Sequence, residues 1–294
     1  MRKLGSVVIG IDFSDSSWVA LGQAARIARC SGAALHAVHV VETGDSPRPS
    51  AKLTPLQQEI RAGLQDEARR RWPGFARGIV DAEEFPLDVS FGSRFGGIYQ
   101  YVLDRGADLL VLGAVGQARP HVGLGTVASG CIRGVPADVL VVRDDFHGPF
   151  RTVVVGVDFS ETSRRALEAG AMLAASEAAK LRVVFVVPDA HGMAMLPSQD
   201  VDQELEMFTR AATDAWPELD VRCDVYPHTG HRSGILEFAT VVHGDIVILG
   251  TRGRTNLRDV VLGSTAEKVL RDSLIAVWAC KPAARLHDDQ HVRL

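Results

Sequence analysis

Two glycine-rich segments have residue types suited to holding a phosphate anion, and the clearer one is Gly250–Thr265. Glycines let backbone N–H groups approach an anion without a clash from Cβ, and successive N–H groups form an anion-binding nest. Gly263 and Ser264 directly precede a helical pattern, and a helix N-terminus favours negative charge. Arg252 and Arg254 add charge-assisted hydrogen bonds. The segment is therefore predicted to bind phosphate through its helix start and its three glycines, Gly250, Gly253 and Gly263.

The hydroxyl of Ser264 has two interpretations. Ser264 and Glu267 have the S-x-x-E spacing of a capping box, in which both side chains bond N–H groups of their own helix. The hydroxyl could instead bond a phosphate, or do both in part. For the whole segment, the alternative is a tight strand-to-helix connection with a capped helix and no ligand.

The other glycine-rich segment, Gly113–Thr126, is a weaker version of the same pattern. Eight residues separate Gly116 from Gly125, whereas nine separate the corresponding glycines of the clearer segment. The helix that opens at Thr126 has no acidic partner for a cap, and Pro120 stiffens the loop. We expect nucleotide binding here to be weakened but not abolished.

These segments belong to two copies of one larger unit. Residues 7–14 recur as 153–160, each with the pattern of an apolar strand followed by Asp-Phe-Ser, and residues 108–113 recur as 245–250. The regular pattern breaks near Asp144–Phe150, which contains glycine and proline. We therefore predict two domains, residues 1–147 and 148–294.

Each copy alternates apolar strands with helical patterns, which predicts an α/β fold with a mainly parallel sheet. The predicted strands are Val7–Ile11, Ala34–Val41, Val80–Val89, Leu109–Leu112 and Val139–Val142, then Val153–Val157, Leu181–Val187, Val221–Tyr226, Ile246–Leu249 and Ile275–Ala279. Helices are predicted at Trp18–Cys30, Thr54–Arg71, Gly97–Arg105, Arg164–Ala179, Val201–Ala215 and Gly234–His243, with another after each glycine-rich segment. Trp72-Pro73 and Trp216-Pro217 are expected to end their helices.

Asp12 and Asp158 each follow the first strand of a copy. Ligands of such sheets bind beyond the carboxyl ends of the strands, where the strand order reverses. An aspartate at a strand–helix junction is also a common turn former or helix cap. Both interpretations stay open on the residues alone.

The spacing Gly250-x2-Gly253-x9-Gly263-Ser264, followed by Thr265 to Arg271, resembles the ATP-binding signature of the universal stress protein family. The strand ending in Asp158-Phe159-Ser160 is similar to that family too, and the resemblance covers essentially the whole chain. It implies two tandem Rossmann-like (HUP-type) domains, each a five-stranded sheet sandwiched by helices. It also implies an adenine nucleotide, ATP with or without Mg²⁺, as the ligand.

The resemblance further implies roles for individual residues. In the second domain, Asp158 and the backbone of Val186 would lie at the adenine, and the ribose and phosphates would be held by Gly250, Gly253, Gly263 and Ser264, with Arg252, Arg254 and Thr265 beside them. The corresponding residues of the first domain, where an empty site is the alternative, are Asp12, Val40, Gly113, Gly116, Gly125 and Thr126.

Three functions are compatible with this resemblance. The first is a stress-response protein whose bound nucleotide alters its association with an unknown protein partner. The second is a slow adenine-nucleotide hydrolase, although no catalytic residue set is recognisable. The third is an interaction protein without nucleotide.

The last strand of each domain, Val139–Val142 and Ile275–Ala279, is apolar and needs covering. By resemblance to the dimer contact of the family, we expect the two domains to pair through these strands as a pseudo-dimer within one chain, and two chains could pair as well. Copy one keeps Pro136 before this strand, whereas copy two has no proline there, which leaves its edge geometry open.

The bulk composition excludes several other classes. A formal net charge of −4 indicates no nucleic-acid surface, and no apolar run is long enough to span a membrane, so we expect a cytoplasmic protein. The four cysteines form no CxxC pair, and Cys131 and Cys280 are expected to be inert core thiols. His228 and His231 are expected in a surface loop and not in a metal site.

Overall fold

The computed structural model describes residues 4–43, 53–115, 124–143, 146, 148–188, 199–253 and 262–282. The strands are β1 (Ser6–Ile11), β2 (Ala34–Glu42), β3 (Leu87–Gly92), β4 (Leu109–Gly113), β5 (Asp138–Val142), β6 (Thr152–Gly156), β7 (Lys180–Pro188), β8 (Val221–His228), β9 (Ile246–Gly250) and β10 (Ala276–Cys280). The helices are α1 (Asp15–Ser31), α2 (Pro55–Ala76), α3 (Arg94–Asp104), α4 (Thr126–Gly134), α5 (Glu161–Glu177), α6 (Gln199–Thr213), α7 (His231–Val241) and α8 (Ser264–Asp272).

All ten strands form one sheet in the order β3-β2-β1-β4-β5-β10-β9-β6-β7-β8. In each half the chain first runs outward through three strands and then returns to the other side of the first one. The order therefore reverses between β1 and β4 and between β6 and β9, and both of these pairs are parallel. The predicted α/β class, with two tandem Rossmann-like domains, is confirmed.

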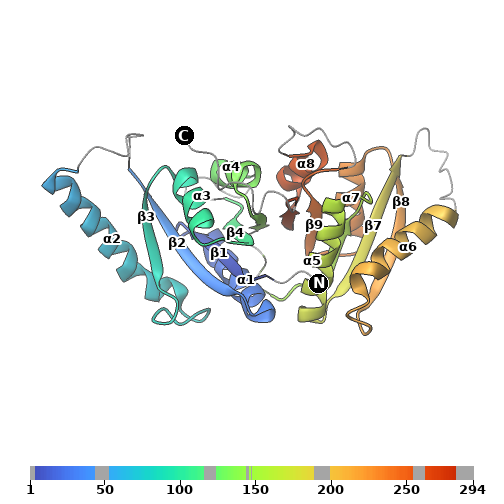
Figure 1. Cartoon of the computed structure of the whole chain (residues 1–294), viewed down its shortest axis with the longest axis horizontal. Coiled ribbons are helices and arrows are strands. Elements are labelled where there is room, and N and C mark those ends of the chain that lie inside the picture. Colours follow the sequence, from blue (N-terminus) through green and yellow to red (C-terminus); the bar gives the residue numbers. More distant parts are fainter. Residues whose placement is uncertain are drawn as a thin grey trace.

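The helices cover both faces of the sheet, and each face has its own hydrophobic core that runs through both domains. One core contains Leu21 of α1, Trp72 of α2 and Leu167 of α5, whereas the other contains Val102 of α3, Ile132 of α4 and Leu270 of α8. Figure 1 shows the two halves side by side, with α4 and α8 facing each other at the centre. Because parallel strands are buried on both faces, their sequences are continuously apolar.

The domains join through β5 and β10, the only antiparallel neighbours in the described sheet. Leu140 lies opposite Trp278 in this pair. The indole Nε1 of Trp278 donates to Asp138 Oδ2 at 3.1 Å, and the backbone N–H of Lys281 donates to Asp138 Oδ1 at 2.9 Å. The predicted pseudo-dimer within one chain is therefore confirmed, and the absence of a proline before β10 does not prevent its pairing.

Two parts of the sequence prediction were wrong. The third strand begins at Leu87 and not at Val80, because the acidic segment after Val80 folds as a turn in which Phe85 N–H donates to Asp81 O at 2.9 Å. Trp72-Pro73 does not end its helix, since α2 continues to Ala76 with the proline inside it. Trp72 is buried, and its Nε1 donates to Phe85 O at 2.7 Å.

No helix in the described parts of the chain is long and apolar enough to cross a membrane.

Candidate functional site

Asp158 lies just past the carboxyl end of β6, beside the point where the strand order reverses. Its Oδ1 accepts a hydrogen bond from Ser160 N–H at 3.0 Å, and Ser160 is the N-cap of α5. Between them, Phe159 has a left-handed backbone with φ of 61°. The turn therefore fixes Asp158 at the carboxyl edge of the sheet. After it the chain reverses direction, so that α5 runs back along β6.

The loop after β9 comes close to this aspartate. A Cβ added to Gly253 would lie 2.8 Å from Asp158 Oδ2, and one added to Gly250 would lie 2.6 Å from Thr162 Oγ1. At Gly250 the added atom would also lie 2.8 Å from the backbone C of Thr162, so glycine is needed there, whereas at Gly253 it would meet only the carboxylate of Asp158. The structure thus brings Gly253 close to Asp158 and Gly250 close to the first turn of α5.

Hydrogen bonds fasten the loop to the start of α5. The hydroxyl groups of Thr162 and Ser160 both donate to Arg252 O, the latter at 3.4 Å. At its base, Thr251 N–H donates to Cys280 O at 2.9 Å. Thr162 was not among the residues predicted from the sequence. Thr162 lies in the first turn of α5, opposite Gly250 at the end of a strand. In the first domain Ser16 lies opposite Gly113 in the same way, so a small hydroxyl residue at this position of both copies is the signal that could have identified it.

Arg252 carries a buried nitrogen without a hydrogen-bond partner among the described residues, its Nε. A buried guanidinium N–H costs free energy unless it is satisfied. Arg252 lies between Gly250 and Gly253 in the loop that is predicted to hold the phosphates. A phosphate oxygen is the kind of acceptor that would satisfy this buried N–H.

The far end of the loop leads into α8, and here one prediction was wrong. The N-cap of α8 is Gly263, with φ of −67° and ψ of 145°, and the helix has no side-chain cap. Ser264 is consequently the first helical residue, so it does not form a capping box with Glu267. Gly263 N–H donates to Thr251 O at 2.7 Å, which closes the loop by a backbone bond instead.

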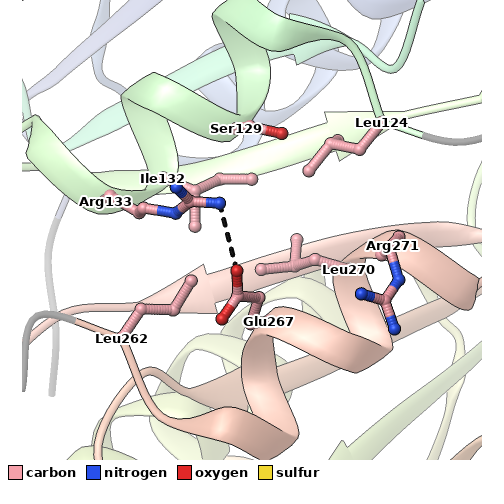
Figure 2. Close-up of a pocket in the computed structure, with 8 residues that line it drawn as sticks. All are labelled: Leu124, Ser129, Ile132, Arg133, Leu262, Glu267, Leu270 and Arg271. Carbon is pink, nitrogen blue, oxygen red and sulfur yellow. Dashed lines mark hydrogen bonds and ion pairs between the residues drawn. The ribbon is translucent and has the colours of Figure 1, made fainter.

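Glu267 bonds across the domain boundary. Its Oε1 lies 3.0 Å from Arg133 Nη2 of α4. Figure 2 shows this ion pair at a pocket of about 90 Å³ between α4 and α8, whose walls come from equivalent positions in the two domains: Leu124, Ser129, Ile132, Arg133, Leu262, Glu267, Leu270 and Arg271. None of the predicted nucleotide-binding residues lines this pocket.

Val186 lies near the end of β7 with a buried side chain. A Cβ added to Gly234 of α7 would lie 2.7 Å from Val186 Cγ1, so the helix passes very close to this strand. His231 Nδ1 is 3.0 Å from Val186 O. The expected surface loop for His228 and His231 is wrong, because His228 ends β8 and His231 begins α7.

A polar cluster lies next to Val186, on β8 and α7. Glu237 Oε1 accepts from the Tyr226 hydroxyl at 2.6 Å, and Glu237 Oε2 lies 3.2 Å from His228 Nε2. The Tyr226 hydrogen bond is the main cause that lowers the pKa of Glu237 and raises the pKa of Tyr226. No group of three potential metal ligands among His, Cys, Asp and Glu occurs in the described residues.

The first domain repeats the frame of this site. Asp12 Oδ1 accepts from both N–H and Oγ of Ser14, at 3.0 and 2.5 Å. Gly125 N–H donates to Ala114 O at 2.8 Å, which matches the bond from Gly263 to Thr251. The loop ends are therefore alike in spite of the missing residue.

The other residues predicted for the two sites lie at helix starts and near strand ends. Gly125 is the N-cap of α4 and Thr126 its first residue, whereas Thr265 follows Ser264 in α8. Val40 packs closely against Gly97 of α3, as Val186 does against α7. Gly116 and Arg254 lie outside the described residues.

Comparison with known proteins agrees with the duplicated fold. The sequence model of the Universal stress protein family matches residues 4–143 and again 149–281. A universal stress protein of Mycobacterium tuberculosis is 27% identical over 296 residues, covering 94% of this chain and 97% of its own. A crystal structure of a universal stress protein from Archaeoglobus fulgidus covers 95% of this chain and 97% of its own, at 17% identity and a TM-score of 0.65, which supports the fold.

A universal stress protein solved in complex with cAMP also matches. It is 24% identical, covers 45% of this chain and 97% of its own length, and has a TM-score of 0.37.

Proposed function

Because this chain belongs to the universal stress protein family, we propose that it is a stress-response binding protein that takes ATP or a related adenine nucleotide, mainly in its second domain. In this proposal the bound nucleotide changes how the chain associates with a protein partner. The protein acts as a regulatory module and needs no catalytic residues for this role.

The observation that carries the proposal is the convergence of Asp158, Gly253 and Arg252 at one strand end. A Cβ added to Gly253 would lie 2.8 Å from Asp158 Oδ2, and Arg252 of the same loop buries an Nε that has no hydrogen-bond partner among the described residues. Parallel α/β sheets bind ligands at this edge, where the strand order reverses. The start of α8 adds backbone N–H groups that suit a phosphate.

The proposed roles of single residues come from the resemblance to the family. Asp158 and the Val186 backbone are assigned to the adenine side of the site. Loop and helix-start residues are assigned to the ribose and phosphates, namely Gly250, Arg252, Gly253, Arg254, Gly263, Ser264 and Thr265. The first domain is assigned a weaker or empty site, with a domain boundary at residues 147 and 148.

Mg²⁺, if it accompanies ATP, would be held chiefly by phosphate oxygens, since the described residues contain no ready cluster of metal ligands. The Ser264 hydroxyl does not cap its own helix, which leaves it suited to a phosphate or a phosphate-bound ion. We also propose that a second copy of the chain can associate, which sedimentation analysis would detect.

Calorimetric titration with ATP tests the proposal. Wild-type protein is expected to bind one equivalent, and Gly263→Val to lose this binding, because an added Cβ already lies 3.2 Å from Thr251 O at the base of the loop. Gly125→Val is the matched control, since the first-domain glycine has the same surroundings, with Ala114 O at 3.3 Å. It should leave the second-domain site intact.

Absence of heat from the wild-type protein at millimolar ATP would exclude nucleotide binding. Equal loss of binding in both variants, with unchanged far-ultraviolet circular dichroism, would show that the assignment to the second domain is wrong.

A further inference from the structure

The backbone N–H and C=O groups of Val186 point to the side of β7 on which β6 lies, beyond the end of β6. Val157 N–H donates to Val184 O at 3.0 Å, so Val184 faces β6. Backbone groups in a strand face alternate sides, and Val186, two residues further on, therefore faces the same way. β6 itself ends at Gly156, which is level with Val184. The C=O of Val186 is thus available beyond the last strand residue, on the side of Asp158.

The imidazole of His231 forms a hydrogen bond with this carbonyl oxygen. Its Nδ1 lies 3.0 Å from Val186 O, and because the carbonyl can only accept, Nδ1 is the donor. His231 is the exposed first residue of α7, and the close contact between Gly234 and Val186 brings this first turn over the strand. An exposed side chain on a helix start can rotate away without disturbing the core.

No equivalent contact occurs among the described residues of the first domain. Arg94 begins α3 as His231 begins α7, but its Nη2 pairs with Glu42 Oε2 at 3.0 Å. The histidine contact is therefore particular to the domain with the fuller glycine loop. Neither the strand pairing nor the helix cap of α7, which is Gly230, requires it.

We propose that His231 controls access of the nucleotide base to the second-domain site by competing for the Val186 carbonyl. This inference rests on the proposed function. A base that donates to this oxygen competes with the imidazole for it, and a carbonyl left without a donor costs free energy. The site therefore takes bases that bring an N–H donor of their own, such as the exocyclic amino group of adenine. The triphosphate, which binds at the loop, is independent of His231.

The test compares ATP with inorganic triphosphate on the full chain by calorimetry. In His231→Ala the competing donor is gone, so the dissociation constant for ATP is expected to fall roughly two- to tenfold, the range of a single net hydrogen bond. The constant for inorganic triphosphate should not change. Arg94→Ala, at the equivalent position of the first domain, is the matched control and should leave both constants as in the wild type.

A second measurement uses the wild-type protein alone. Nitrogen-15 NMR of the His231 ring should show Nδ1 protonated in the free protein, with this signal shifting on saturation with ATP but not with inorganic triphosphate. ATP binding that is equal or weaker in His231→Ala, or a ring signal unmoved by ATP, would overturn the inference and leave the proposed function standing. No ATP binding by either wild type or variant would instead refute the proposed function.

Discussion

Phe13 and Phe159 show how single residues shape the two strand ends. Each follows the strand-end aspartate and has φ of 61°, a conformation that is uncommon for residues other than glycine. The ring of Phe159 packs against Phe185 and Phe208, with centroids 4.7 and 5.4 Å away. Packing thus stabilises a backbone that the side chain alone would disfavour, and this turn sets the direction of Asp158.

The four cysteines should differ sharply in reactivity. Cys131 is fully buried, and this burial raises the pKa of its thiol to about 12, so almost no thiolate exists at pH 8. Cys280 is also buried, whereas Cys30 is exposed. Brief treatment of native protein with a thiol reagent at pH 8, followed by peptide mass spectrometry, should find Cys30 modified and Cys131 and Cys280 unmodified.

Denatured protein, in which all four thiols should react, provides the control. Rapid modification of Cys131 in the native state would contradict its place in the core between α4 and the sheet.

At the scale of elements, the start of α8 shows how a difference of one residue in the helix start decides whether a serine is the N-cap. Ser160 caps α5, and its Oγ accepts from Ser163 N–H at 3.2 Å. Ser264 looks like a cap in the sequence, but α8 begins one residue earlier than a capping box requires. The backbone bond from Gly263 to Thr251 O sets this start, and it is a contact across the loop that local patterns do not contain.

The two serines should therefore respond differently to replacement by alanine. Ser160→Ala removes a true N-cap and should lower the free energy of unfolding by about 1 kcal/mol. Ser264→Ala removes no cap and should change it by no more than about 0.3 kcal/mol, since alanine suits a helix at least as well as serine. Urea unfolding followed by circular dichroism measures both. A larger loss from Ser264→Ala than from Ser160→Ala would show that α8 does use a serine cap.

At the scale of the whole molecule, the domains bond across their boundary at equivalent positions. Arg143 Nη2 donates to Leu270 O of α8 at 3.2 Å, and the buried Lys281 Nζ donates to Ile132 O of α4. On the other face of the sheet, Arg26 Nε of α1 lies 3.2 Å from Glu177 Oε1 of α5. Since both cores also cross the boundary, we expect the domains to unfold together.

Asp138 should be important for this joint unfolding, because it is fully buried and accepts from both Trp278 and Lys281 of the other domain. Asp138→Ala leaves these donors unsatisfied and should lower the free energy of unfolding by about 3 kcal/mol. Calorimetric melting should still show one transition at a lower temperature.

Asp104→Ala is the control, because Asp104 is exposed and its carboxylate accepts from Gln100 Nε2 of the same helix at 2.7 Å, away from the domain boundary. Two separate transitions in the wild-type protein would contradict a core shared by both domains.

A role for Asp158 beside a glycine loop followed only from the resemblance to a known family. The repeat of strand patterns and the parallel fold could both be predicted from the sequence itself. Each depends on residues close together in the chain or on a pattern that occurs twice, and apolar runs such as Val153–Val157 have few alternatives to a buried strand.

Only the tertiary structure decided which groups at the site are already bonded. His231 reaches Val186 O, Thr162 reaches Arg252 O, and Glu267 reaches Arg133 in place of its own helix. The partners in these pairs are far apart in sequence, and their side chains have several possible acceptors or donors within reach. The choice among these depends on helix register and close packing, such as that of Gly234 on Val186, which a linear pattern does not specify.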